Sequence, residues 1–316
     1  MLQGRAGYIA RVLCVAEPMN ARPRPDGQLE ALFAGGWPAF ITADQDVKQR
    51  IGRVRELFAD LELVLLDGGG VIVAAGWAVP ISWTGEQADL PAGYADSLAR
   101  ALAAEHSDQA ADTLVVMAAQ VHPDRRGQGL AGELLTALRG LAGQRGWQQV
   151  IAPVRPTLKA CYSLTPIGTF ASWTREDGSP LDPWLRTHWR LGARVIAMAP
   201  RSQRMTGTAA GWESWTGMVL PSSGDYIIPA GWPCCTSIAT VTKASIPSPT
   251  SGSSTSNSHR PRGGWTTPRR WWRCQPAPAA GAPGASSTSR SQPVNADTQC
   301  LLTITSPGAG DGGMDA

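Results

Sequence analysis

Two hydrophobic periods alternate along the first half of the chain, and they predict alternating strands and helices. Apolar runs at residues 62–66, 71–79 and 113–121 have the length and continuity of buried strands. Over residues 47–58 and 129–144, apolar positions instead recur every three or four residues, as on one face of an amphipathic helix. The pattern predicts an α/β fold.

Turn signals connect these elements in a definite order. Asp67 and three glycines separate the first two apolar runs, which predicts a β-hairpin, and Trp77 on the second run is expected in the core or a pocket wall. Residues 84–112 are interpreted as an insertion with a short helix at 94–104 that covers a site, and a further strand is predicted at 148–154. This order fits a sheet whose ligand lies at the strand ends.

A glycine-rich turn follows the strand at 113–121. Pro123 removes a backbone donor where the strand should end, and Gly127 and Gly129 let the main chain approach an anion without a Cβ in the way. A helix is predicted from Leu130, so the free N–H groups of residues 127–131 lie at a helix N-terminus, which attracts a pyrophosphate. Glycine spacing alone leaves an ordinary tight turn open.

The residue order in this turn is more specific than its glycines. The sequence RGQGLA at 126–131 fits neither the dinucleotide pattern GxGxxG nor the P-loop pattern GxxxxGK[ST]. With its V-x-P-x-x-R lead-in, it resembles the R/Q-x-x-G-x-G/A motif of the GCN5-related N-acetyltransferases.

The resemblance implies a mixed, mostly antiparallel sheet flanked by helices. It also implies direct transfer of an acetyl group from acetyl-coenzyme A to an amine of a small molecule, without a metal. Main-chain N–H groups near Val121 would stabilise the oxyanion, and the turn would bind the coenzyme phosphates. The residues assigned to coenzyme binding are Val121, Arg125, Arg126, Gly127, Gln128, Gly129, Leu130 and Ala131.

A second segment, DPWLRTHWRLGARVI at 182–196, resembles the family's N-P-x-x-x-x-Y-x-x-x-G-F helix and strand. Asp182 stands in the Asn place and His188 in the Tyr place. His188 is therefore a candidate proton donor to coenzyme A sulfur, with a reference pKa of about 6.5 against about 10 for a phenol. Tyr162 is the other candidate donor, and Lys159 is a candidate for binding an anionic substrate group. The alternatives are a structural histidine and a packed surface loop.

A general base is not evident in the sequence. Many relatives place a Glu on the motif strand, but Met117, Ala118 and Ala119 occupy that region here. Either water relays the proton, or the chain is a non-catalytic module that binds acyl-coenzyme A. Acidic residues elsewhere are expected to be solvated charges: Glu86, Glu105 and Glu133.

Composition divides the chain into parts. Residues 1–230 carry 21 Lys plus Arg and 22 Asp plus Glu, whereas residues 231–316 carry 7 and 3 and are rich in Ser, Pro, Gly and Thr. The predicted organisation is an N-terminal extension at 1–18, an acetyltransferase domain at 19–230 and an irregular, low-complexity tail. The basic tail leaves an interaction protein open as an alternative, although its Arg/Trp cluster at 265–273 is not expected to bind nucleic acid.

The tail can also be interpreted as the product of a frameshift. Read in another frame from Gly231 with G/C-rich codons, it yields LAVLHVDRDRDEGVDTEPDVW, which resembles the C-terminal ends of actinobacterial family members. The alternative is a natural disordered tail. A frameshift near Pro229 would remove the family's final strand, which inserts between two others. We then expect unpaired backbone groups, low stability and weak replacement by residues 238–242.

The sequence contains no run of about 18 apolar residues, and Arg5 and Arg11 interrupt the apolar segment that a signal peptide would need. The six cysteines lack zinc-ligand spacing. We expect a cytoplasmic protein without a membrane or nucleic-acid partner, and the sequence does not indicate its oligomeric state.

Overall fold

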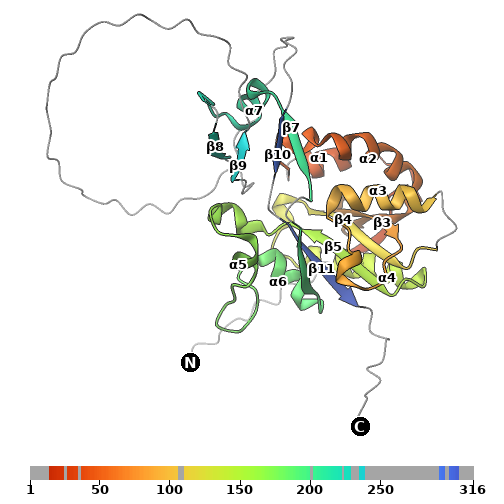
Figure 1. Ribbon diagram of the computed structural model, residues 1–316. Coiled ribbons are helices and arrows are strands. Elements are labelled where there is room, and N and C mark those ends of the chain that lie inside the picture. The colour runs from red at the N-terminus through yellow and green to blue at the C-terminus, as the bar shows by residue number, and fades with distance from the viewer. Residues whose placement is uncertain are drawn as a thin grey trace, which may run out of the picture.

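The computed structural model describes a central sheet, helices on both of its faces, and three short strands after residue 230 (Figure 1). The described residues are 14–24, 27–34, 37–105, 110–199, 202–222, 224–228, 235–238, 292–295 and 299–305.

Seven strands form the central sheet in the order β1-β2-β3-β4-β5-β11-β6. Every neighbouring pair is antiparallel except β4 and β5, which are parallel. This topology confirms the expected mixed, mostly antiparallel sheet. The strands are β1 Val15–Pro18, β2 Glu62–Leu66, β3 Ile72–Ile81, β4 Thr113–Val121, β5 Gln149–Val154, β6 Arg194–Ala199 and β11 Gln299–Thr305.

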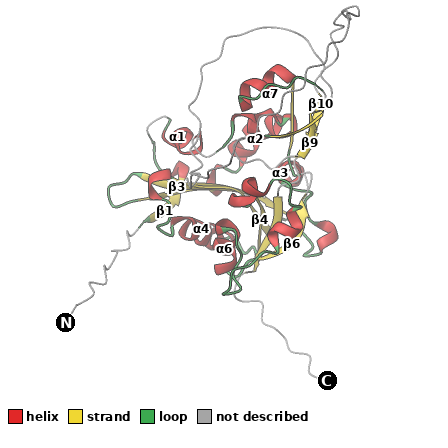
Figure 2. Ribbon diagram, turned by 90° about the vertical axis from the view of Figure 1, so that its left-hand side faces the viewer, coloured by secondary structure: helices red, strands yellow, loops and turns green. Residues whose placement is uncertain are grey.

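Helices cover both faces of the sheet (Figure 2). On one face, α2 and α3 bury Val54 and Leu98 against β3 and β4. On the other face, Leu134 and Leu138 of α4 pack against the same strands, so β3 is buried at every position. The helices are α1 Gln28–Ala34, α2 Gln45–Leu57, α3 Tyr94–Glu105, α4 Leu130–Gln144, α5 Ile167–Ala171, α6 Pro183–Arg190 and α7 Ala209–Thr216.

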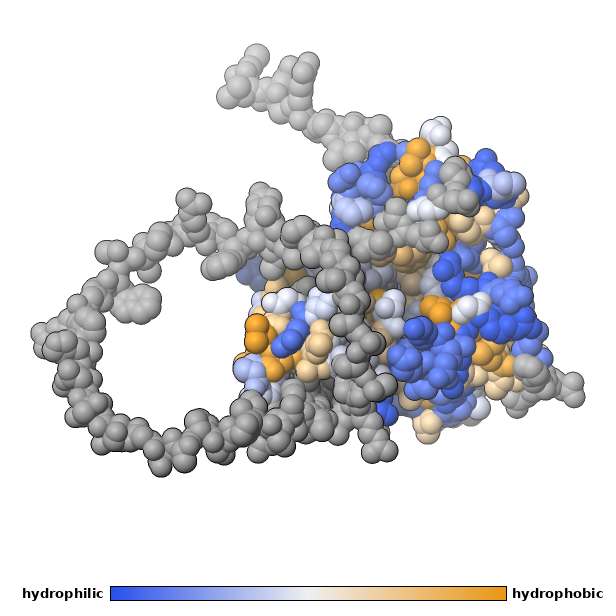
Figure 3. Space-filling model, turned by 90° about the horizontal axis from the view of Figure 1, so that it is seen from above, coloured by the Kyte–Doolittle hydropathy of each residue, from blue (hydrophilic) through white to orange (hydrophobic). Residues whose placement is uncertain are grey.

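The surface outside these layers is largely polar. Viewed from above, hydrophilic side chains predominate on the described surface, and hydrophobic residues show as small patches between them (Figure 3). In the described part of the chain, no helix is both long and apolar enough to cross a membrane.

Asp182 begins α6 and ties it to the loop after β5. Its carboxylate is 1% exposed and accepts hydrogen bonds from the N–H groups of Trp184 (2.9 Å), Leu185 (3.0 Å) and Leu158 (2.7 Å). A side-chain acceptor at this position satisfies donors that a helix start leaves unpaired. The residue therefore holds the start of α6 against the loop that follows β5.

Replacing Asp182 with alanine is expected to lower the free energy of unfolding by about 3 kcal/mol, because three N–H groups lose their acceptor. Asp182→Asn keeps one side-chain oxygen and is expected to cost about half as much. Urea unfolding of both variants beside the wild type measures the difference. A wild-type value for Asp182→Ala would show that the cap contributes nothing.

The first strand lies earlier than the predicted domain start at residue 19. β1 pairs antiparallel with β2, with Val15 opposite Leu66 and Pro18 opposite Leu63. A short 3-10 helix, Met19–Ala21, follows it. Part of the predicted N-terminal extension thus belongs to the central sheet.

The slot for the final strand is filled, contrary to the expectation that it would stay unpaired. β11, blue in Figure 1, pairs along β5 from Cys300 opposite Val154 to Thr305 opposite Gln149, and its other edge pairs with β6. The run QCLLTIT has strong β propensity, and two open strand edges favour pairing with such a run. The frameshift itself remains a prediction.

Other tail segments form small sheets away from this slot. β9 Cys235–Ile238 pairs with β8 Gly224–Ile227, and β10 Gln292–Asn295 pairs with β7 Arg204–Gly207. Ile238 thus lies in β9 and not between β5 and β6. The remainder of the predicted replacement strand and the Arg/Trp cluster at 265–273 lie outside the described residues.

Candidate active site

β4 and β5 separate soon after they begin. Their parallel pairing ends after three residue pairs, with Val115 opposite Ile151. The register of β3 against β4 shifts between Trp77 and Ala78, which indicates a bulge that bends β4. A cavity of about 430 Å³ adjoins the diverging ends. Its lining consists of residues 116–121 and 152–157 with Trp37, Pro38, Tyr94, Arg126, Ala131, Trp184, His188 and Gln203.

The turn after β4 leads from this cavity into α4. Gly127 and Gly129 have φ angles of 78° and 84°, in the left-handed region that favours glycine. A Cβ placed on either would find nothing within 4 Å, so the space beside the main chain is open. Because α4 begins at Leu130, the preceding and first helical N–H groups lack intrahelical acceptors. The geometry suits an anion.

The two arginines of the turn have different surroundings. Arg125 forms an ion pair with Asp67 of the β2–β3 turn at 2.8 Å and does not line the cavity. Arg126 lines the cavity and is exposed. The Leu130 side chain is 4% exposed in the core, so only its main chain faces the turn, and Gln128 is exposed outside the cavity. Arg126 is therefore the cation of this turn that faces the cavity.

His188 reaches the same cavity from α6. It is 1% exposed, and neither ring nitrogen has a hydrogen-bond partner among the described residues. Its ring packs edge-on against Trp184 at 4.5 Å. Burial lowers the pKa of His188 to about 4, so the imidazole is neutral at pH 7 and offers one donor and one acceptor.

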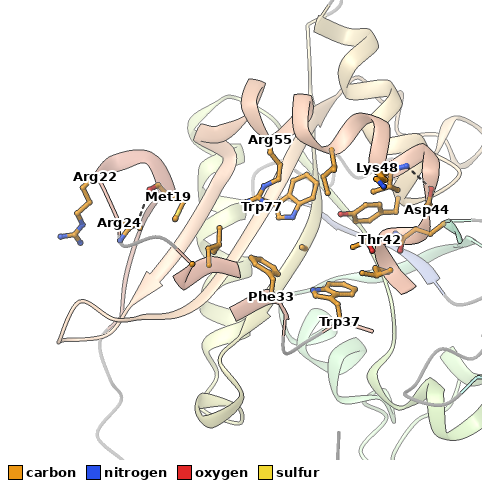
Figure 4. A pocket seen from close by; sticks show the side chains of 18 residues that line it. Met19, Arg22, Arg24, Phe33, Trp37, Thr42, Asp44, Lys48, Arg55 and Trp77 are labelled. Carbon is orange, nitrogen blue, oxygen red and sulfur yellow. Dashed lines mark hydrogen bonds between the residues drawn. The ribbon is translucent and has the colours of Figure 1, made fainter. Parts of the chain in front are cut away.

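A larger cavity of about 750 Å³ lies on the side of α1 and α2 (Figure 4). It shares Trp37, Tyr94, Ala118 and Gln203 with the smaller cavity. Trp77 lines it, which confirms the expected pocket wall. Sequence reasoning did not single out Trp37 or Gln203, and the only signal for Tyr94 was its place in a predicted covering insertion.

No family model matches the chain. The arginine N-acetyltransferase avaD of Aspergillus versicolor is 30% identical to it over 224 residues, which cover 64% of this chain and 76% of that relative. The chain belongs to the GCN5-related N-acetyltransferase family. It is thus an acetyltransferase.

Two solved structures illustrate the similarity in fold. The loading GNATL domain of CurA from Lyngbya majuscula is 21% identical and covers 55% of this chain and 81% of that chain, with a TM-score of 0.43. The GphF GNAT-like decarboxylase in complex with isobutyryl-CoA is 23% identical and covers 55% and 84%, also with a TM-score of 0.43. These likenesses concern the fold alone.

Tyr162, the second candidate proton donor of this acetyltransferase, lies elsewhere. It is 39% exposed, lines neither cavity, and packs against Phe170 and Trp173 at 5.5 and 5.0 Å. Lys159 is 2% exposed, and its ammonium donates to the carbonyls of Tyr162 (3.0 Å) and Ser163 (3.4 Å). This lysine stabilises the loop instead of facing a substrate.

Among the residues that the structure describes, the lining of the smaller cavity contains no Asp or Glu. Met117, Ala118 and Ala119 line it at the place where the family resemblance implies a glutamate in many members. The three alternative acids named from the sequence line neither cavity. Within the described residues, His188 therefore brings to this acetyltransferase's candidate site an imidazole whose two nitrogens have no partner, and no His, Cys, Asp and Glu cluster there could hold a metal ion.

The buried His188 should make the acetyltransferase sensitive to acid. Its pKa is about 4 in the folded chain and 6.5 when exposed, so between these values the unfolded state binds a proton that the folded state does not. The free energy of unfolding is therefore highest above pH 6.5. It falls by roughly 3 kcal/mol as the pH drops from 6.5 through 4. Urea unfolding at several pH values measures this loss. His188→Phe should flatten the profile, and an unchanged profile would contradict the assignment.

Proposed function

We propose that the chain transfers an acetyl group from acetyl-coenzyme A to an amine of a small molecule by direct attack. The observation that carries the proposal is the cavity where β4 and β5 diverge, because it brings Val121, Arg126 and His188 together. The pyrophosphate would bind at Arg126 and the N–H groups of residues 127–131. The pantetheine arm would enter between the two strands.

The main chain of β4 supplies a donor for the oxyanion. His122 N–H donates to the Val73 carbonyl of β3 at 2.9 Å. Successive N–H groups of a strand point to opposite sides, so Val121 N–H points toward the side from which β5 has separated. A donor at that place stabilises the negative charge that develops on the thioester oxygen.

His188 is suited to the proton transfers. The amine nitrogen attacks the thioester carbon, the carbon–sulfur bond breaks, and the electron pair leaves on sulfur while the amine loses a proton. A neutral imidazole can donate its N–H to the departing sulfur and accept the amine proton, directly or through water, at its other nitrogen. The sequence predicted His188 only as a proton donor to sulfur. With a pKa of about 4 it is a neutral imidazole at neutral pH, so we assign it both a donor and an acceptor role.

The proposal of a small-molecule amine as acceptor rests on a relative in the same family. The relative avaD is by name an arginine N-acetyltransferase, which supports a small-molecule amine as the acceptor here. The test is incubation of the 316-residue chain with acetyl-coenzyme A and a panel of amines, with thiol release and acetylated amine measured together. The proposal expects amine-dependent release with a matching N-acetyl product. Thiol release that is independent of every amine would contradict it.

The alternative named from the sequence, a non-catalytic acyl-coenzyme A module, conflicts with the family membership, and only the lack of Asp or Glu among the described residues of the smaller cavity favours it. This module would bind acetyl-coenzyme A in a calorimetric titration and form no product with any amine. Binding together with product formation would exclude it.

A further inference from the structure

The two cavities adjoin each other, because four residues line both: Trp37, Tyr94, Ala118 and Gln203. The smaller cavity holds the site proposed for the thioester. The larger cavity then offers the route by which an acceptor amine reaches the acetyl group. Its volume of about 750 Å³ suffices for an amino acid or a larger metabolite.

Aromatic and aliphatic side chains line the middle of the larger cavity, and cations lie along its edges. Figure 4 shows Phe33, Trp37 and Trp77 around the centre, with Arg55 beside Trp77 and Lys48 at the end near Asp44. Arg22 and Arg24 lie at the other end (Figure 4).

One face of α2 supplies two of these cations. Lys48, Ile51 and Arg55 are spaced by three and four residues, so they follow one side of the helix, and all three line the cavity. The Lys48 ammonium has no partner among the described residues. Arg55 engages one nitrogen with Glu62 at 2.5 Å, which leaves the other guanidinium donors available.

The acidic groups nearby are already committed. Asp44 is the one carboxylate among the described lining residues, is 1% exposed, and accepts hydrogen bonds from the N–H groups of Val47 (3.1 Å) and Arg204 (2.7 Å). Arg22 and Arg24 share the single carboxylate of Glu17. The described lining therefore has cationic groups to spare and no uncommitted carboxylate for a second cation of the substrate.

We propose that the larger cavity is an acceptor site for amines that carry a carboxylate, and that Lys48 and Arg55 bind this carboxylate. The inference rests on the proposed acetyl transfer and names its substrate class. The Lys48 ammonium has no compensating acid among the described residues, and a substrate carboxylate would supply one, while Arg55 keeps Glu62 on one nitrogen and offers its other donors. The arrangement disfavours polyamines, because their second ammonium would meet Lys48 without a compensating acid.

Matched acceptors test this selection, since arginine and agmatine, like lysine and cadaverine, differ only in the carboxylate. The proposal expects kcat/KM at least about tenfold higher for the carboxylate-bearing member of the preferred pair. Lys48→Met should lower that ratio by about tenfold through KM, with kcat nearly unchanged. Arg53→Met is the control, because Arg53 lies on the same helix, pairs with Glu56 at 3.1 Å and does not line the cavity.

Calorimetric binding of the same amines to the chain saturated with coenzyme A gives a readout that needs no turnover. Weaker binding of the carboxylate-bearing amine by Lys48→Met, and not by Arg53→Met, supports the inference. Equal use and binding of both members of each pair, or a Lys48→Met chain with wild-type discrimination, overturns it. A chain that binds these amines selectively but forms no product contradicts the proposed function and leaves the carboxylate site standing.

Discussion

Replacing Gly129 with aspartate is expected to weaken acetyl-coenzyme A binding by about a thousandfold. The position has φ of 84° and open space beside it, so the new side chain fits but faces the region assigned to the pyrophosphate. A carboxylate there repels the phosphates at close range and opposes the favourable field of the α4 N-terminus. Calorimetric titration of acetyl-coenzyme A into the variant measures the loss.

Gly146→Asp is the matched control for this experiment. Gly146 has φ of 76° and likewise nothing within 4 Å of an added Cβ, but it lies just beyond the C-terminal end of α4. The two variants therefore carry the same backbone strain, roughly 1–2 kcal/mol, and differ in where the charge lies. Equal affinities for the coenzyme in both variants would show that the turn does not hold the phosphates.

Replacing His188 with phenylalanine is expected to lower kcat by about a thousandfold, within the range for loss of a general acid or base. The aromatic ring keeps the packing against Trp184 and leaves no polar atom unpaired, because neither imidazole nitrogen has a partner among the described residues. Affinity for acetyl-coenzyme A should stay within about threefold of the wild type, since the phosphate site is untouched. Steady-state kinetics with a saturating amine measure both quantities.

Tyr162→Phe separates the two candidate donors. The Tyr162 hydroxyl lies outside both cavities, so its removal should leave kcat nearly unchanged. A large loss of kcat in Tyr162→Phe together with a small loss in His188→Phe would reverse the assignment.

Much of the domain could be predicted from local sequence because its elements have strong, continuous patterns. β4 matches the predicted strand at 113–121, and α4 begins at Leu130 and ends at Gln144, close to the predicted range. α3 likewise ends one residue beyond the expected helix at 94–104. Apolar runs and helical spacing determine such elements before any long-range contact forms.

The pairing of distant strands and the burial of individual side chains could not be predicted from local sequence patterns. β11 pairs with β5 although about 150 positions separate them, and the decisive factor is the open edge of two strands rather than a local pattern. No local pattern indicated that His188 would be desolvated or that Gln203 would reach both cavities. Such features depend on packing between distant segments.

The most direct test of acetyl transfer at this site is a crystal structure of the 316-residue chain with a non-hydrolysable acetyl-coenzyme A analogue. The account predicts the pyrophosphate on the N–H groups of residues 127–131, the pantetheine between β4 and β5, and the thioester mimic within hydrogen-bond distance of Val121 N–H and beside His188. A coenzyme bound elsewhere on the chain, or with its acyl end away from His188, would contradict it.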